Sequence, residues 1–248
     1  MLADVSWIGI DFAFTMMNPL TMHHSRVIPE MYKVLGRPEE GQARLQRWYR
    51  LRDSLGGPND APHQRVRLLK EYNRERMNAE VFDNDPRALE LYGEMEARER
   101  KPSAGLDGAL KFLKGRGRRL SIVSEVTSIE GALSIAAFIR VNGFAGLFDE
   151  MITPAGRFTP AGKLLDEVTF RGATKKDGVM YARLSEYLDS KRIGAQHRAM
   201  IGDDPKLDID LAKKYGFVTI QYRGIVDRGK AEQADYVIAD WKELLREA

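Results

Sequence analysis

The chain has 248 residues, of which 43% are hydrophobic and 30% charged, and this composition excludes a largely disordered or fibrous protein. Because 39 basic residues face 36 acidic ones, the net charge of +3 is too small to predict a nucleic-acid partner. No apolar run reaches the roughly 18 residues of a membrane span, and the absence of cysteine excludes disulfides and cysteine-bound metals. The chain starts without a leader pattern, so we expect a cytoplasmic protein with no membrane partner.

The first predicted element is a short apolar run over residues 5–11, which is typical of a buried parallel strand. From about residue 17 to residue 100 the sequence is rich in Arg and Glu, and its apolar residues recur at helical spacing. This segment is predicted to form three or four helices. Gly, Pro, Asn and Asp gather at the candidate loops, which are residues 36–38, 56–60 and 83–86.

After residue 100 the pattern alternates between helices and strands. Helices are predicted at 106–113 and 129–141, and strands at 120–124, 150–153, 199–202, 218–222 and 236–238. Such alternation favours a right-handed βαβ sheet with helices on both faces. We therefore predict an α/β protein with a Rossmann-like parallel sheet core, residues 1–16 and 101–248, and an inserted α-helical unit, residues 17–100.

Polar side chains end three of the predicted strands. They are Asp11 after the first strand, Ser124 after the second, and Asp203, Asp204 and Asp208 after the fourth. Each could simply cap a helix, and for Ser124 taken alone capping is the favoured interpretation. In an open parallel sheet, however, the ligand crevice lies at the carboxyl ends of the strands. Three polar strand ends on one edge therefore predict a functional site.

These segments resemble the four motifs of the haloacid dehalogenase (HAD) superfamily, in the same order and spacing. The first motif is an apolar strand followed by Asp-x-Asp-x-Thr or a variant, the second a strand that ends in Ser or Thr, the third a Lys ahead of a helix, and the fourth Gly-Asp-x-x-x-x-Asp. The matching segments are Asp11-Phe-Ala-Phe-Thr15, Ile122-Val-Ser124, Lys175 in preference to Lys176, and Gly202-Asp203-Asp204 through Asp208. The resemblance covers nearly the whole chain outside the helical insert.

The chemistry of these residue types agrees with the resemblance. A carboxylate such as Asp11 can attack a phosphoryl or carbon centre and form a covalent intermediate. Asp11 and Asp203, with Asp204 as a further candidate, would form with a backbone carbonyl an oxygen site suited to Mg²⁺. Ser124 and Lys175 would hold the anionic group of the substrate.

The resemblance implies further roles. Asp208 would orient the lysine or a metal-bound water, the backbone carbonyl of Ala13 would ligate the metal, and Thr15 would contact the substrate. The helical insert matches the superfamily's first cap class, a mobile lid that carries substrate contacts. Within it, Arg50 is a candidate for binding a substrate carboxylate or phosphate, as are Arg47 and Arg52, although a solvated helix face is the favoured interpretation for any one of them.

The sequence departs from the pattern at Ala13. The superfamily's phosphatases carry a second Asp there that protonates the leaving group, a contribution of about 10²- to 10⁴-fold in rate. One interpretation is a substrate whose leaving group needs no proton from this position. A second is a phosphonoacetaldehyde hydrolase, although neither Lys33 nor Lys70 lies in a recognisable imine motif.

Two other interpretations stay open. A 2-haloacid dehalogenase also lacks the second Asp, but it does not need the acids of the fourth motif, which are present here. A catalytically weak protein that binds a phosphorylated ligand is the last. The leading prediction is a Mg²⁺-dependent hydrolase of a small phosphorylated or phosphonate metabolite, acting through an aspartyl intermediate on Asp11. Its partner would be a small anionic molecule, with a homodimer as a candidate assembly.

Overall fold

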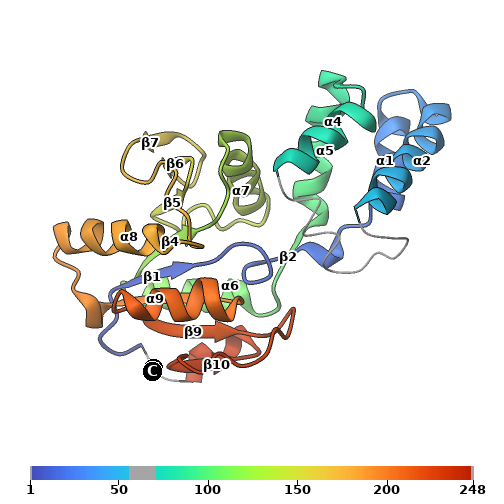
Figure 1. The fold of residues 1–248 in the computed structure, drawn as a ribbon. Helices are drawn as coiled ribbons and strands as arrows, with labels where there is room; N and C mark the ends of the chain where they lie inside the picture. Colours follow the sequence, from blue (N-terminus) through green and yellow to red (C-terminus); the bar gives the residue numbers. More distant parts are fainter. Residues whose placement is uncertain (1, 56–70, 247–248) are drawn as a thin grey trace. The chain divides into compact units, whose positions relative to one another are not determined.

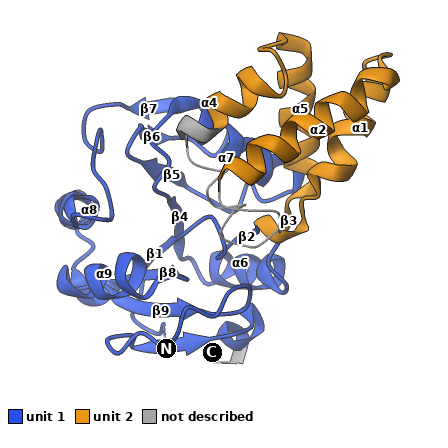
Figure 2. Ribbon diagram, turned by 45° about the vertical axis from the view of Figure 1, so that its right-hand side comes forward, with its two compact units in different colours: residues 1–18, 102–248 blue, residues 19–101 orange. Residues whose placement is uncertain are grey.

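The computed structural model describes residues 2–55 and 71–246, so the candidate loop at 56–60 lies outside the described residues. The chain forms two compact units, residues 1–18 with 102–248 and residues 19–101 (Figure 2). Among the described helices, none is long and apolar enough to cross a membrane.

An eight-stranded sheet forms the centre of the first unit (Figure 1), in the order β10-β9-β8-β1-β4-β5-β6-β7. The strands are β1 (Trp7–Ile10), β4 (Arg119–Val123), β5 (Glu150–Thr153), β6 (Gly156–Phe158), β7 (Leu164–Asp166), β8 (Arg198–Gly202), β9 (Val218–Tyr222) and β10 (Tyr236–Ile238). All pairs from β10 to β5 are parallel, which confirms the predicted α/β class. The strands β6 and β7 extend the sheet with antiparallel pairing, which was not predicted.

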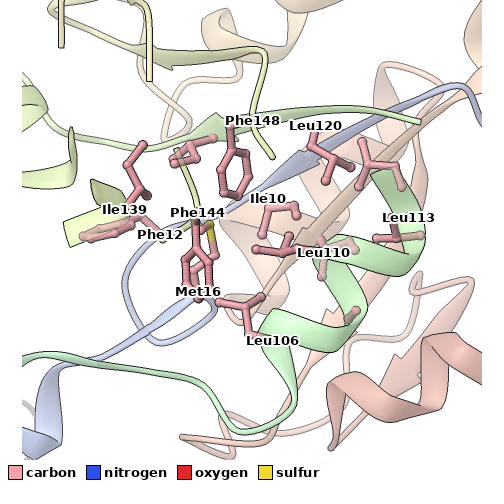
Figure 3. Packing of buried hydrophobic residues seen from close by; sticks show 14 of the residues in the cluster. Ile10, Phe12, Met16, Leu106, Leu110, Leu113, Leu120, Ile139, Phe144 and Phe148 are labelled. Carbon is pink, nitrogen blue, oxygen red and sulfur yellow. The ribbon is translucent and has the colours of Figure 1, made fainter. Parts of the chain in front are cut away.

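Helices cover both faces of this sheet. They are α6 (Leu106–Gly115), α7 (Ile129–Val141), α8 (Val179–Ser190) and α9 (Leu211–Lys214), with the short helical turns η2 (Ala195–His197), η3 (Pro205–Asp210) and η4 (Trp241–Arg246). Successive side chains of a strand point to opposite faces, so Ile8 and Ile10 pack in one core with α6 and α7 (Figure 3), whereas Trp7 packs in the other with α8 and α9. The central strands are therefore buried on both faces.

The second unit is helical and has a hydrophobic core of its own. It contains η1 (Pro19–Thr21), α1 (His24–Val34), α2 (Pro38–Ser54), α4 (Glu71–Glu80) and α5 (Pro86–Glu99). Proline at the first position starts α2 and α5, and the Asp85 carboxylate caps α5 by accepting from the backbone N–H groups of Arg87 and Ala88. Where the chain leaves and re-enters the first unit, β2 (Met17–Asn18) pairs with β3 (Lys101–Pro102).

Candidate active site

The register of the sheet brings the polar strand ends together. The strand β1 lies between β4 and β8, and Ile10 pairs with Ile122 on one side and Ile201 on the other. Asp11 follows directly, and its backbone N–H donates to the carbonyl of Ile201 at 2.8 Å. The side chains that follow β1 and β8 are therefore placed next to each other at the carboxyl edge of the sheet.

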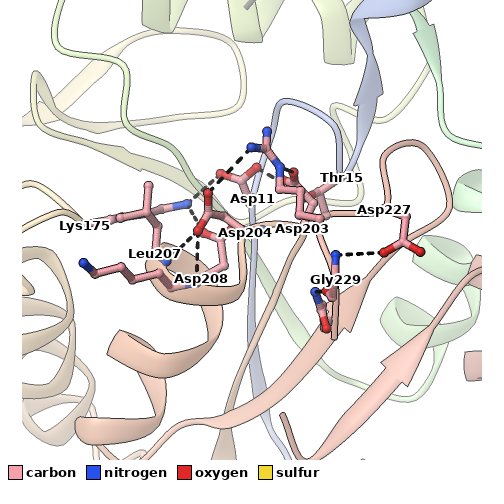
Figure 4. A network of polar contacts seen from close by, with 12 residues as sticks. Asp11, Thr15, Lys175, Asp203, Asp204, Leu207, Asp208, Asp227 and Gly229 are labelled. Atoms are coloured by element: carbon pink, nitrogen blue, oxygen red, sulfur yellow. Dashed lines mark hydrogen bonds and ion pairs between the residues drawn. The ribbon is translucent and has the colours of Figure 1, made fainter. Parts of the chain in front are cut away.

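Three carboxylates cluster at this edge (Figure 4). One oxygen from each of Asp11, Asp203 and Asp208 lies within 4.8 Å of the others. All three are largely buried, with exposed side-chain fractions of 13%, 5% and 3% respectively. The hydroxyl of Thr15 lies 3.3 Å from both Asp11 Oδ2 and Asp203 Oδ1. The cluster thus concentrates negative charge where water is scarce.

One lysine bridges two carboxylates of this cluster. Lys175 Nζ donates to Asp11 Oδ1 at 2.6 Å and to Asp208 Oδ1 at 2.7 Å, and the side chain is 1% exposed. The neighbouring Lys176 is exposed. Of the two lysines weighed from the sequence, the geometry brings Lys175 to the site.

The fourth motif folds locally so that Asp208 turns back towards the strand end. The Asp204 carboxylate caps the following turn by accepting from the backbone N–H groups of Lys206 and Leu207. The backbone N–H of Asp204 in turn donates to Asp208 Oδ2 at 3.1 Å. A Cβ at Gly202 would collide with the Asp208 side chain, so the close approach requires glycine.

Two residues that the sequence analysis missed hold the cluster. Glu125, which directly follows Ser124, accepts a hydrogen bond from the backbone N–H of Lys175. Arg228, in the loop after β9, donates from Nε to Asp203 Oδ2 at 2.7 Å. Glu125 could have been predicted as a site residue, because it follows directly after a strand end. Nothing in the local sequence indicates such a role for Arg228.

The electrostatics of the cluster show an excess of negative charge. Burial, together with the Asp208 and Asp203 carboxylates, raises the pKa of Asp11 to about 8 in spite of the lysine beside it. Burial and Asp208 also raise the pKa of Asp203 to about 6, against the opposing effect of Arg228. Although burial alone would lower it, the pKa of Lys175 is raised well above its usual value by Asp11 and Asp208. The lysine therefore stays protonated.

Solved structures of HAD-superfamily hydrolases resemble this chain over almost its whole length. A HAD phosphatase from Thermococcus onnurineus is 17% identical, with 98% of this chain and 97% of that chain covered and a TM-score of 0.54. YfnB from Bacillus subtilis, described as a HAD-hydrolase bound to magnesium, is 14% identical, covering 98% and 97% with a TM-score of 0.57. A dehalogenase with an intermediate complex is 12% identical, covering 99% and 98% with a TM-score of 0.57. The chain has the HAD fold.

The resemblance seen in the motifs is thereby confirmed at the level of the fold. No protein-family model matches the sequence, and a comparison with curated proteins gave no match. The likeness to these structures is one of fold, at 12% to 17% sequence identity.

The donor set of the HAD core fits a Mg²⁺ ion. Lys175 contacts Oδ1 of Asp11 and Arg228 contacts Oδ2 of Asp203, and the opposite oxygens of both carboxylates lie 3.3 Å from the same Thr15 hydroxyl. Mg²⁺ prefers carboxylate, carbonyl and water oxygens. These carboxylates, with the excess charge described above, supply such ligands. The Asp204 carboxylate lies outside the three-residue cluster and accepts hydrogen bonds at the start of η3.

Other predicted site residues have more limited positions. Ser124 is buried and follows β4, with its backbone N–H donating to Ile152 at 3.0 Å. Ala13 forms a bridge with Met17, next to the carboxylates in the chain. Arg50 lies on α2 in the helical unit, where it is exposed. Their contacts with substrate or metal stay predictions.

Proposed function

We propose that this protein is a Mg²⁺-dependent hydrolase of a small phosphorylated or phosphonate metabolite, with Asp11 as the nucleophile. The observation that carries the proposal is the bridge of Lys175 Nζ from Asp11 to Asp208. It holds one oxygen of Asp11 and leaves the other on the side of Thr15 and Asp203. A buried carboxylate held in one orientation is suited to attack an electrophile.

The chain's own residues account for the first step. One carboxylate oxygen of Asp11 attacks the phosphorus, the bond from phosphorus to the leaving group breaks, and an aspartyl phosphate forms. Lys175 and Ser124 would hold the phosphoryl oxygens as charge develops on them. Water then attacks the phosphorus of the aspartyl phosphate and releases Asp11 and phosphate.

Asp11, Asp203 and Asp208, with the backbone carbonyl of Ala13, would hold the Mg²⁺ ion. When bound, it reduces the repulsion between the Asp11 carboxylate and an anionic substrate. The helical unit, residues 19–101, would act as the cap that excludes water and supplies substrate contacts such as Arg50.

Ala13 limits which leaving groups depart easily, because its methyl group cannot donate a proton. We expect substrates with acidic leaving groups, such as acyl phosphates, to be hydrolysed about 10²-fold or more faster than alkyl phosphomonoesters. A phosphatase with an acid at this position would show a much weaker dependence on the leaving group.

The test is a panel of acyl phosphates, phosphomonoesters, phosphonoacetaldehyde and 2-haloacids, run with Mg²⁺ and with a chelator. Wild type is compared with Asp11→Asn and with Asp107→Asn, a matched change at an exposed carboxylate that pairs with Lys111. We expect Asp11→Asn to lose about 10³-fold or more in turnover and Asp107→Asn to be unchanged. A phosphorylated form detected by mass spectrometry in wild type and absent from Asp11→Asn would support the intermediate.

Hydrolysis of a carbon–halogen bond is the second candidate, favoured by Ala13 because a departing halide needs no proton. It would be recognised by halide release that a chelator does not reduce. Equal background rates from wild type and Asp11→Asn across the panel would contradict both proposals and favour a binding protein.

A further inference from the structure

A second cation lies on the carboxylate cluster, and neither the motifs nor the proposed chemistry uses it. Besides the contact of its Nε with Asp203, Arg228 places Nη1 3.9 Å from Asp204 Oδ2. Its guanidinium lies over the ring of Phe14, at 5.5 Å from the ring centroid. One arginine is thus held by groups from both the first and the fourth motif.

The loop that carries Arg228 is built to hold its shape. On one side, Asp227 accepts from the backbone N–H of Gly229 at 2.9 Å (Figure 4) and pairs with Arg223. On the other side, the Gln221 side chain donates to the carbonyl of Gly229 at 2.7 Å and accepts from the backbone N–H of Ala231 at 2.8 Å. The arginine therefore projects from an ordered turn.

The ring beneath the guanidinium belongs to Phe14 and is also held in a defined position. Phe14 is buried and has a φ of +64°, a left-handed conformation that is uncommon for a residue other than glycine. It lies between Ala13 and Thr15 in the first motif. Its ring supports the guanidinium directly beside the proposed metal ligands.

The position of Arg228 matters because a metal ion and the guanidinium would both bind the Asp203 carboxylate. Arg228 Nε holds Oδ2 of Asp203, and the proposed metal site uses the same side chain. A fixed positive charge at this distance opposes a divalent cation. We propose that Arg228 is a built-in competitor for Mg²⁺, which pairs with Asp203 in the metal-free protein and weakens the binding of the ion. The inference rests on the metal site of the proposed function.

The test measures Mg²⁺ affinity by isothermal titration calorimetry on the full-length protein, with no substrate present. Arg228→Gln removes the charge and keeps a polar side chain, whereas Arg228→Lys keeps the charge. Lys111→Gln is the matched control, because it makes the same change in net charge at the exposed Asp107 pair on α6. We expect Arg228→Gln to bind Mg²⁺ about tenfold more tightly than wild type or more, with the other two variants close to wild type.

An unchanged or weaker affinity in Arg228→Gln overturns the inference, provided that circular dichroism shows the variant to be folded. Asp203→Asn separates this failure from that of the proposed function. If wild type and Arg228→Gln bind equally and Asp203→Asn does not bind, the competition is wrong and the metal site stands. If neither wild type nor Arg228→Gln binds Mg²⁺, the inference and the metal site both fail.

Discussion

Both units bury carboxylates, and the pKa values of these carboxylates move in opposite directions. Burial raises the pKa of Asp11 at the sheet edge to about 8. Glu96 in the helical unit is 3% exposed, and burial alone would also raise its pKa, but Arg100 and Arg74 lower it to about 2. Arg74 reaches the Glu96 oxygens at 2.7 and 2.5 Å, and Arg100 forms a further ion pair with it.

The difference teaches that the balance of buried charges, more than burial itself, separates the two clusters. Glu96 has two guanidiniums for one carboxylate, whereas the three carboxylates of Asp11, Asp203 and Asp208 share two cations, Lys175 and Arg228. A carboxylate with compensating partners is suited to holding helices together. A cluster with excess charge is costly to the fold and is typical of a site that binds a further cation.

The largest effect is expected from breaking the compensated cluster. Glu96→Gln leaves the buried guanidinium of Arg100 and the partly buried one of Arg74 facing a neutral group, and should lower the free energy of unfolding by about 3–5 kcal/mol. Urea denaturation measures this change. Glu94→Gln is the control, because the exposed Glu94 pairs with Arg98 one turn along the same helix and should contribute no more than about 0.5 kcal/mol. Similar losses in both variants would contradict the distinction.

The pH dependence of stability sharpens the same point. The pKa of Glu96 is about 2 in the folded state, against about 4.5 for a glutamate without these partners, as in the unfolded chain. Its contribution to the free energy of unfolding is therefore complete above pH 4.5 and is lost as the pH falls towards 2. The loss should amount to about 3 kcal/mol. Urea titrations between pH 5 and 2.5 should show it in wild type and not in Glu96→Gln. Parallel curves for the two proteins would be the contrary result.

Relieving the uncompensated cluster should have the opposite sign. Asp11→Asn removes one of three crowded carboxylates, and should raise the free energy of unfolding of the metal-free protein by about 1–2 kcal/mol while it abolishes turnover. The measurement is urea denaturation in a chelator, with Asp107→Asn as the neutral control. A destabilised Asp11→Asn would mean that the pairing of the Asp11 carboxylate with Lys175 outweighs its repulsion by Asp203 and Asp208.

A smaller effect is expected from the residue that supports the lysine. Glu125→Ala removes the acceptor for the backbone N–H of Lys175, and should lower kcat by about tenfold, or about 1.4 kcal/mol in the barrier. Glu125→Gln keeps an acceptor oxygen and should lose less. Steady-state kinetics on the best substrate of the panel distinguish them, and equal activity in all three proteins would remove Glu125 from the site.

The strands of the sheet could be predicted because buried parallel strands leave a strong local signal. The predicted limits of the strands at 150–153, 218–222 and 236–238 are those of β5, β9 and β10. The strands β6 and β7 have three residues each, too few for a periodic pattern, and their pairing is decided by the hairpin they share.

The site could be predicted only as far as strand ends and motifs reach. Asp11 and Asp203 meet because the register of β1 and β8 brings them together. Arg228 could not be predicted, because its contact depends on a loop whose path follows from Gln221 and Asp227. The burial of His24, which stacks on Trp48 at 4.6 Å, likewise depends on tertiary packing.

The pairing of β2 with β3 has a consequence for how such a protein can change. Neighbouring strands lie about 5 Å apart, so the helical insert begins and ends at nearly the same point. A segment with adjoining ends can be lengthened, shortened or exchanged without displacing β1 or β4, because the chain on either side keeps its path. The insert can therefore change during evolution as a separate segment while Asp11, Lys175 and Asp208 keep their positions.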